Sequence, residues 1–250
     1  MKKIELSPGI FEYRFEPFEG QFFANKIIAI IDETKVLLID AAYENQMNEV
    51  LDDLKSNDLI VEKVIISHFH DDHMQGLKKL SNVTIYGSDD YKKTLDLWTP
   101  IEEHKIFTPN VLVKDSLKIN FGNHIIEMIK SPGHSECTIL VKINDEFLYI
   151  GDELMFSNEG EPILPCISKN ETKRQLNNAS KLYGYKNMKI IPAHGILFEG
   201  EEKIEKEIKN VIIYLEALMN SNHNISYEES VKNCTCNFLH KNWHDKINTK

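Results

Sequence analysis

The segment Ser67-His68-Phe69-His70-Asp71-Asp72-His73 concentrates imidazole and carboxylate side chains at the end of an apolar run. His68 and His70 are two residues apart, so in an extended strand both point to one face and can bind the same ion. If a helix begins after His70, Asp72 and His73 project beside the first pair and offer a second ion an oxygen and a nitrogen. The spacing alone predicts one metal site or two, and makes a merely solvated polar loop the weaker interpretation.

Three further ligand-type residues each follow an apolar run and stand beside small residues. They are His134 in Ser131-Pro132-Gly133-His134, Asp152 in Ile150-Gly151-Asp152-Glu153, and His194 in Ile191-Pro192-Ala193-His194-Gly195. Each alone is a weak signal, because a Pro-Gly-His sequence is more often a simple turn. Together with the first segment they supply seven ligands, enough for two divalent ions.

These ligands require a scaffold in which strands end close together. β-Branched runs at residues 26–31 and 36–40 predict a hairpin, and periodicity predicts further strands at 63–67, 83–86, 111–113, 116–121, 125–129, 138–143, 147–151 and 189–191. Helices are predicted at 45–54, 73–80, 88–97, 171–182 and 202–219, with a last one starting near Ser226. This order indicates a layered α/β or α+β domain at residues 1–220, with a helical extension at 221–250 packed on it.

Composition narrows the class of protein. The 250 residues include 29 Lys plus Arg and 39 Asp plus Glu, a formal net charge of -10, with 42% hydrophobic residues. The hydrophobic share supports one sizeable core, while the acidity and the presence of only two arginines disfavour nucleic acid or anionic lipid as partners. Four cysteines are too few for a disulfide framework, and no apolar run could span a bilayer. We expect a cytoplasmic protein that binds a small-molecule substrate.

At this point the sequence resembles a known family. The motif His-x-His-x-Asp-His at residues 68–73, followed by His134, Asp152 and His194 in their contexts, is similar to the metallo-β-lactamase superfamily of metallohydrolases. The likeness extends from Leu38-Ile39-Asp40 to Pro192-Ala193-His194-Gly195 and implies a four-layer αββα sandwich with the site at one edge, between the sheets. By that resemblance the first metal site is His68, His70 and His134, the second is Asp72, His73 and His194, and Asp152 bridges both.

The ligand set indicates the chemistry. Imidazoles and carboxylates without a cysteine suit zinc and also tolerate iron or manganese. Two zinc ions roughly 3.5–4 Å apart can hold a bridging hydroxide, lower a water's pKa toward about 7 and polarise a carbonyl oxygen. Asp72 is then a candidate catalytic residue that exchanges a proton with the water or the leaving group. We expect a dinuclear zinc hydrolase.

Absent features narrow the resemblance to one branch. Asp152 stands where one β-lactamase subgroup has Cys, His70 stands where the diiron flavoproteins have Glu, and no basic arm of the RNA-processing members is present. What remains resembles the glyoxalase II and lactonase branch, whose members hydrolyse an ester, lactone or thioester. A short, lysine-rich carboxyl terminus counts against a glutathione thioester. Two alternatives stay open, a mononuclear iron persulfide dioxygenase and a non-catalytic metal-binding regulatory module.

Substrate contacts are expected from loops around the site. Residues 15–23 are aromatic and resemble the amino-terminal flap of the superfamily; they contribute Phe18 and Phe22, and Trp98 and Tyr183 are the other candidates. On a helix starting near Ser226, Cys236, His240 and His244 would share one face, as a second metal site or, more plainly, as part of a packing surface. A homodimer is the hypothesis drawn from the apolar stripe of that helix, which comprises Tyr227, Val231, Cys234, Phe238 and Ile247.

Overall fold

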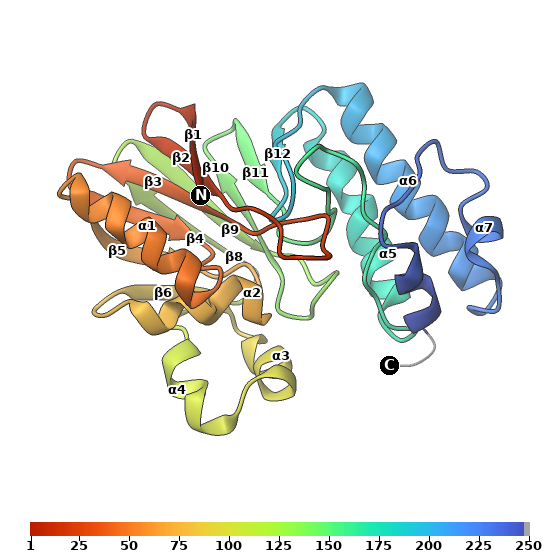
Figure 1. Cartoon of the computed structure of the whole chain (residues 1–250), viewed down its shortest axis with the longest axis horizontal. Helices are drawn as coiled ribbons and strands as arrows, with labels where there is room; N and C mark the ends of the chain where they lie inside the picture. The colour runs from red at the N-terminus through yellow and green to blue at the C-terminus, as the bar shows by residue number, and fades with distance from the viewer. Residues whose placement is uncertain (248–250) are drawn as a thin grey trace.

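The computed structural model describes residues 1–247 and consists of two β-sheets packed face to face, with helices on the outer faces (Figure 1). The first sheet has seven strands in chain order: β1 (Lys2–Ser7), β2 (Ile10–Arg14), β3 (Lys26–Asp32), β4 (Lys35–Ile39), β5 (Ile60–Ile65), β6 (Thr84–Ser88) and β7 (Val111–Val113). The second has five, ordered β12 (Lys189–Ile191), β11 (Phe147–Tyr149), β10 (Ile139–Ile143), β9 (His124–Lys130) and β8 (Ser116–Phe121).

The helices belong to two outer layers. The first sheet is flanked by α1 (Glu44–Ser56), α2 (Asp71–Met74), α3 (Tyr91–Trp98) and α4 (His104–Phe107), with short 3-10 turns η1 (Gln75–Lys79) and η2 (Ile101–Glu103). The second is covered by α5 (Thr172–Lys181), which continues into η3 (Leu182–Tyr185), and by α6 (Glu201–Asn220), which is followed by α7 (Tyr227–Ser230) and η4 (Lys241–Lys246). Within residues 1–247, none of the helices combines the length and apolar character needed to span a bilayer.

Three buried apolar clusters separate these layers. Leu38 of β4 packs with Met47 of α1, whereas its neighbour Leu37 faces the second sheet. On the second sheet Tyr149 faces inward and Leu148 faces α6. The alternation follows from the two-residue period of a strand that is buried on both faces. The predicted four-layer αββα sandwich is therefore confirmed.

Parallel strand pairs determine where the ligand-bearing loops lie. β4 and β5 run parallel, as do β11 and β12, so the chain leaves each pair at a common sheet edge. Asp40 follows β4 and His68 comes shortly after β5, while Asp152 and His194 come after β11 and β12. His134 follows β9, which runs in the same direction as β11 because both strands pair antiparallel with β10. All the predicted ligand segments consequently meet at one edge.

Two parts of the chain differ from the sequence expectation. Strands β1 and β2 were not predicted, although they form the outer edge of the first sheet. The prediction of the last helix is wrong. The α-helix there, α7, has only four residues, and the chain from Val231 to Leu239 has no regular helix. The division into residues 1–220 and 221–250 stays a prediction, and its last residues, 248–250, lie outside the described part of the chain.

A buried charge cluster joins β2 to β3. The Lys26 ammonium lies 3.2 Å from Glu12 Oε2, both side chains are fully buried, and Glu12 also pairs with Arg14. Burial, partly opposed by Glu12, lowers the pKa of Lys26 to about 8. Removing one partner of a buried ion pair leaves an uncompensated charge, which costs more than the pair contributes.

We therefore expect Glu12→Gln to lower the free energy of unfolding by about 3–5 kcal/mol, because Lys26 loses its buried partner. Lys26→Met should cost far less, about 1 kcal/mol, since Glu12 keeps Arg14 and the methionine fills the space. Urea unfolding followed by circular dichroism measures both. Equal costs for the two variants would contradict this account of the cluster.

Candidate metal centre

The first group of ligand atoms consists of three ring nitrogens. His68 Nε2 lies 3.0 Å from His70 Nδ1, which lies 3.2 Å from His134 Nε2. Nitrogen ligands at about 2.0–2.1 Å from a tetrahedral zinc lie about 3.3 Å apart, close to these separations. The three side chains form one of the groups whose ligand atoms all lie within 4.8 Å of one another. Their arrangement fits a single cation.

The second group lies beside the first and shares Asp152 with it. Asp72, His73 and His194 bring one ligand atom each within 4.8 Å of the others. Asp152 Oδ1 lies 3.4 Å from His73 Nε2 and 3.2 Å from His194 Nε2. Its other oxygen, Oδ2, lies 3.8 Å from His68 Nε2 and 3.6 Å from His134 Nε2. The two oxygens of this carboxylate therefore face different groups.

The electrostatics of the two groups differ. Burial, followed by repulsion from neighbouring imidazoles, holds the pKa of His68 well below its usual value and lowers the pKa of His70 to about 3. Both rings are thus neutral ligands at neutral pH. In the second group burial acts against charge, but Asp152 and Asp72 raise the pKa of His194 to about 9. This group attracts positive charge, which a divalent cation would supply in place of protons.

Unpartnered buried atoms support a metal at this place. His73 Nε2, His194 Nε2 and Asp152 Oδ1 are buried and have no hydrogen-bond partner of normal geometry among the described residues. Buried polar atoms in folded proteins are almost always paired, so three such atoms aimed at one point need an explanation. The donor set, nitrogen and carboxylate oxygen, is the one that zinc accepts. The residues present therefore fit the predicted cations.

Asp40, which sequence analysis did not select, orients one of these ligands. Asp40 Oδ2 lies 2.7 Å from His73 Nδ1 and accepts hydrogen bonds from Ser67 Oγ at 2.8 Å and from the Tyr149 hydroxyl at 2.6 Å. Its Oδ1 accepts the Ser67 backbone N–H at 2.7 Å. A carboxylate on one ring nitrogen fixes the tautomer, which leaves His73 Nε2 as the ligand atom. Its position after β4, parallel to the strand that leads to His68, was the available signal.

Glycines beside two ligands allow tight loops. A side chain on Gly133 would place its Cβ 2.2 Å from Glu153 Oε2, the carboxylate that also accepts the His134 backbone N–H at 2.9 Å. Gly195, next to His194, has φ +99° and would clash with Phe156 at 2.5 Å. The small residues noted beside these histidines are thus required by close backbone approach.

Three of the four predicted substrate-contact residues contact either a ligand ring or another aromatic or imidazole ring outside the ligand set. The ring centroid of Trp98 lies 5.7 Å from that of His70, and Phe18 contacts Tyr43 at 5.5 Å. Phe22 contacts His240 at 5.2 Å. Tyr183 lies elsewhere, because η3 packs it into the cluster between the second sheet and α6, beside Glu205. Its position gives no support to a substrate contact.

Sequence analysis missed Phe23 and Tyr43 as residues of the centre. The ring of Phe23 lies 4.7 Å from that of His194, although its neighbour Phe22 was the one selected. Burial first, and then the carboxylates of Asp72 and Asp71, raise the pKa of Tyr43 to about 12. Tyr43 therefore keeps its hydroxyl proton at neutral pH, within electrostatic range of Asp72. No local pattern distinguishes it from the chain's other tyrosines.

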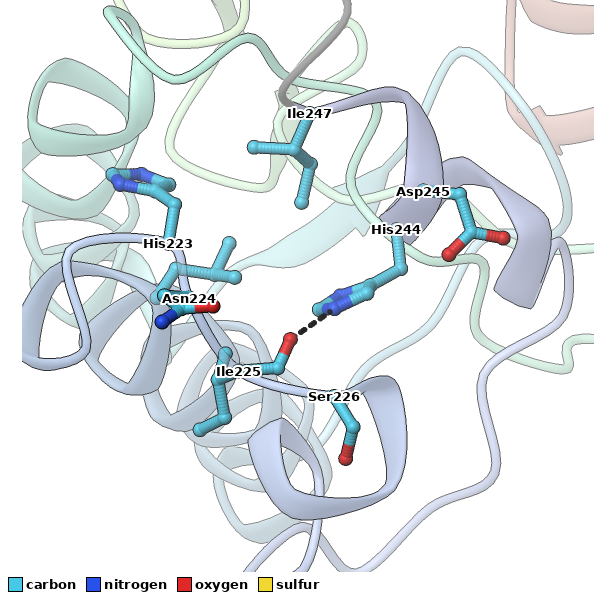
Figure 2. Close-up of a pocket in the computed structure, with 8 residues that line it drawn as sticks. His223, Asn224, Ile225, Ser226, His244, Asp245 and Ile247 are labelled. Carbon is cyan, nitrogen blue, oxygen red and sulfur yellow. Dashed lines mark hydrogen bonds between the residues drawn. The ribbon is translucent and has the colours of Figure 1, made fainter.

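The carboxyl-terminal Cys/His pattern does not form a second metal site. Within residues 1–247, all groups of ligand-type side chains close enough to hold an ion belong to the centre described above. Both ring nitrogens of His244 are engaged, with the Tyr214 hydroxyl at 3.1 Å and the Ile225 carbonyl at 2.9 Å. This histidine lines a separate recess, which Figure 2 shows. The volume of the recess is about 450 Å³. The prediction that Cys236, His240 and His244 share a helical face is wrong, because no helix spans all three positions.

The apolar stripe expected to form a dimer surface is also covered. Phe238 and Ile247 are buried in the cluster between the second sheet and α6. Tyr227, Val231 and Cys234 pack against the same cluster. These side chains stabilise the chain's own fold, so the observation that motivated a homodimer no longer supports one.

Comparison with known proteins decides the family. The sequence profile described as Metallo-beta-lactamase superfamily matches residues 21–194, more than half of the chain. This chain belongs to the metallo-beta-lactamase superfamily. The family predicted from the His-x-His-x-Asp-His motif is confirmed.

Individual relatives refine this placement. A hydroxyacylglutathione hydrolase from Francisella philomiragia is 27% identical over 168 residues, covering 66% of this chain and 60% of the relative. A protein of the same name from Francisella tularensis subsp. novicida is 30% identical over 163 residues, covering 61% and 60%. The name denotes glyoxalase II, so the branch favoured by sequence is the one in which these relatives lie. The matched part amounts to about 60% of the relatives' length.

Solved structures confirm the superfamily fold. A metallo-beta-lactamase from Pontibacter korlensis superposes with a TM-score of 0.69 at 16% identity, covering 86% of this chain and 98% of that one. An archaeal superfamily protein from Sulfolobus tokodaii gives 0.57 at 19% identity, covering 74% and 79%.

The Asp40 network generates a test of the centre. Asp40→Asn should weaken zinc affinity by about 10–100-fold, because an amide cannot accept from all the donors that face this carboxylate or hold the His73 tautomer. Tyr149→Phe is the matched control, since it removes one donor and leaves the contact between Asp40 and His73. Competition against a chromogenic chelator measures both variants. A zinc affinity unchanged in Asp40→Asn would show that His73 needs no such support.

Proposed function

We propose that this protein is a hydrolase that holds two divalent cations, zinc by preference, and cleaves the carbonyl bond of an ester, lactone or thioester. The observation that supports it best is the placement of Asp152. Its two carboxylate oxygens face two different histidine pairs, which is what a ligand shared between two cations requires. Two adjacent cations would supply a water acidified to a pKa near 7 and a Lewis acid for the carbonyl oxygen.

Asp72 is the proton-transfer group in this proposal. Its burial opposes ionisation, but the imidazoles of His73 and His194 lower its pKa to about 2, so it is a carboxylate at neutral pH. Its side chain is 23% exposed, while the His73 and His194 side chains of the same group are at most 2% exposed. An ionised carboxylate that reaches the open side of the site can accept a proton from water and return it to the leaving group.

Tyr43 is the residue to which this proposal assigns the orientation of the substrate. Because its pKa lies at about 12, its hydroxyl keeps its proton and can donate to an oxygen held near Asp72. A neutral donor aimed at a developing negative charge stabilises it without adding a charge to the site. We assign to Tyr43 the substrate contact that was predicted for Tyr183, which lies beside α6 instead.

The pairing of Arg174 bears on whether the site has a free cation for an anionic substrate. Arg174 donates to the Gly133 carbonyl at 3.1 Å, next to His134, but pairs with Glu136 at 3.4 Å and Glu171 at 3.1 Å. The charge of Arg174 is therefore already balanced by two carboxylates, so this arginine gives no support to an anionic substrate. The relatives act on hydroxyacylglutathione according to their name, and a thioester remains within the proposed class.

Metal analysis and a substrate panel test the proposal. Protein purified without chelator should contain about two zinc per chain and hydrolyse at least one of p-nitrophenyl esters, S-lactoylglutathione or acyl-homoserine lactones, with activity lost to chelator and restored by zinc. Cephalosporins and bis-p-nitrophenyl phosphate complete the panel. One iron per chain with persulfide-dependent oxygen consumption would contradict hydrolysis, and so would full activity in the absence of metal.

Substitution of Asp72 tests the assigned proton transfer. Asp72→Asn should lower kcat/KM by about 10²–10⁴-fold, because an amide cannot accept the proton. Asp71→Asn is the matched control, since the neighbouring carboxylate accepts a hydrogen bond from Gln75 at 2.9 Å instead of joining a ligand group. Metal content is measured on each variant. An Asp72→Asn enzyme with unchanged kcat/KM would remove Asp72 from the mechanism.

A further inference from the structure

A small lobe beside the metal centre exposes apolar side chains. Residues 91–107 form α3, η2 and α4, which project from the sheet edge next to α2 (Figure 1). At the tip, Leu97 is 77%, Trp98 52% and Ile101 80% exposed. Such residues normally pack away from water, and when several gather on a surface they mark a binding site.

The fold of the lobe does not need these side chains. The buried face of α3 consists of Tyr91, Thr94 and Leu95, which pack inward at helical spacing. Leu97 lies on the opposite, solvent face, where a polar residue would serve equally well. Ile101 begins η2, whose residues include none that is buried. Packing therefore explains neither exposed aliphatic residue.

The lobe is fixed to the loop that bears a metal ligand. Thr94 Oγ1 lies 2.8 Å from Ser135 Oγ and 3.2 Å from Cys137 Sγ, and Ser135 is adjacent to His134. At the end of the same helix, the Trp98 ring meets the His70 ring at 5.7 Å. The Trp98 end of the apolar tip is therefore held next to the first group of ligands.

We propose that this tip, Leu97, Trp98 and Ile101, binds the aliphatic acyl chain of the substrate while its carbonyl lies at the metal centre. The proposal rests on the hydrolase function above and narrows its substrates to medium- or long-chain acyl esters, lactones or thioesters. Trp98 forms the inner end of the apolar surface, and Leu97 and Ile101 extend it.

Other occupants fit less well. Residues 96–103 carry three carboxylates and no lysine or arginine, which disfavours an anionic lipid surface. Three side chains provide only part of the roughly 800 Å² per partner that a stable interface between copies needs. A neutral hydrocarbon chain requires neither a cationic surface nor a large area, because each methylene contributes separately.

Chain-length dependence of hydrolysis is the first measurement. In the wild type, kcat/KM for p-nitrophenyl octanoate should exceed that for p-nitrophenyl butyrate by about tenfold or more. This corresponds to roughly twofold for each of the added methylenes, as expected if each is half buried. Leu97→Ser/Ile101→Ser should reduce that ratio at least fivefold. The matched control, Ile60→Ser/Ile125→Ser, alters two residues that are 69% and 49% exposed at the strand ends away from the centre, and should keep the wild-type ratio.

Direct binding is the second measurement and does not depend on turnover. The chain has two tryptophans, so Trp243→Phe leaves Trp98 as the sole indole reporter. Titrating the purified holoprotein with 1-decanol should shift Trp98 emission to shorter wavelength, with 1-butanol having at least tenfold weaker effect. Adding Leu97→Ser/Ile101→Ser should weaken the 1-decanol response at least fivefold.

The two measurements separate this proposal from the hydrolase function. If no ester is hydrolysed but 1-decanol binds with the stated dependence, the acyl site stands and the hydrolase proposal fails. Hydrolysis without chain-length preference, together with no 1-decanol response, would overturn the acyl site alone. Sedimentation velocity serves as a further check: loss of a wild-type dimer in Leu97→Ser/Ile101→Ser, with an unchanged ester ratio, would assign the tip to self-association and overturn the proposal.

Discussion

The centre depends on the hydrogen bonds that the Asp40 carboxylate accepts. This carboxylate receives the Ser67 backbone N–H and hydroxyl from the loop that leads to His68, contacts His73 directly, and accepts the hydroxyl of Tyr149 from the second sheet. One buried acceptor thereby links both sheets to the ligand loop. Its φ of +60° lies in the left-handed region, where aspartate is among the residues that tolerate it best. Four donors compensate the cost of burying its charge.

A second constraint is the concentration of polar groups in a buried place. Five imidazoles and two carboxylates converge where the parallel pairs β4–β5 and β11–β12 end, and most of these side chains are nearly inaccessible to solvent. In the second group burial opposes protonation, but the carboxylates outweigh it and raise the pKa of both His73 and His194, so cations there would replace protons. Metal binding and proton release are therefore coupled at this edge, which makes metal affinity dependent on pH.

The surroundings of the centre are asymmetric. Trp98 and the α3–α4 lobe stand on the side of His70, whereas Phe23 stands on the side of His194 and is joined to His240 at 5.5 Å. The second side is thus formed by the amino-terminal flap and the carboxyl-terminal segment together, two parts of the chain that sequence cannot pair. A substrate at the centre would meet an open apolar lobe on one side and a more enclosed aromatic wall on the other.

The sequence alone determined a layered α/β class, because strand and helix periodicity are local patterns. Its dense His/Asp motif carried the resemblance that implied the family and the four layers, and it made seven residues candidate metal ligands. The sequence could not determine Asp40, Tyr43 or Phe23 as residues of the centre, since their roles arise from contacts between distant segments. It also misjudged residues 227–247, where helical spacing of Cys236, His240 and His244 predicted a shared face. There the tertiary structure decided: burying Phe238 and Ile247 against α6 stabilises an irregular path more than a helix would, and so separates those side chains.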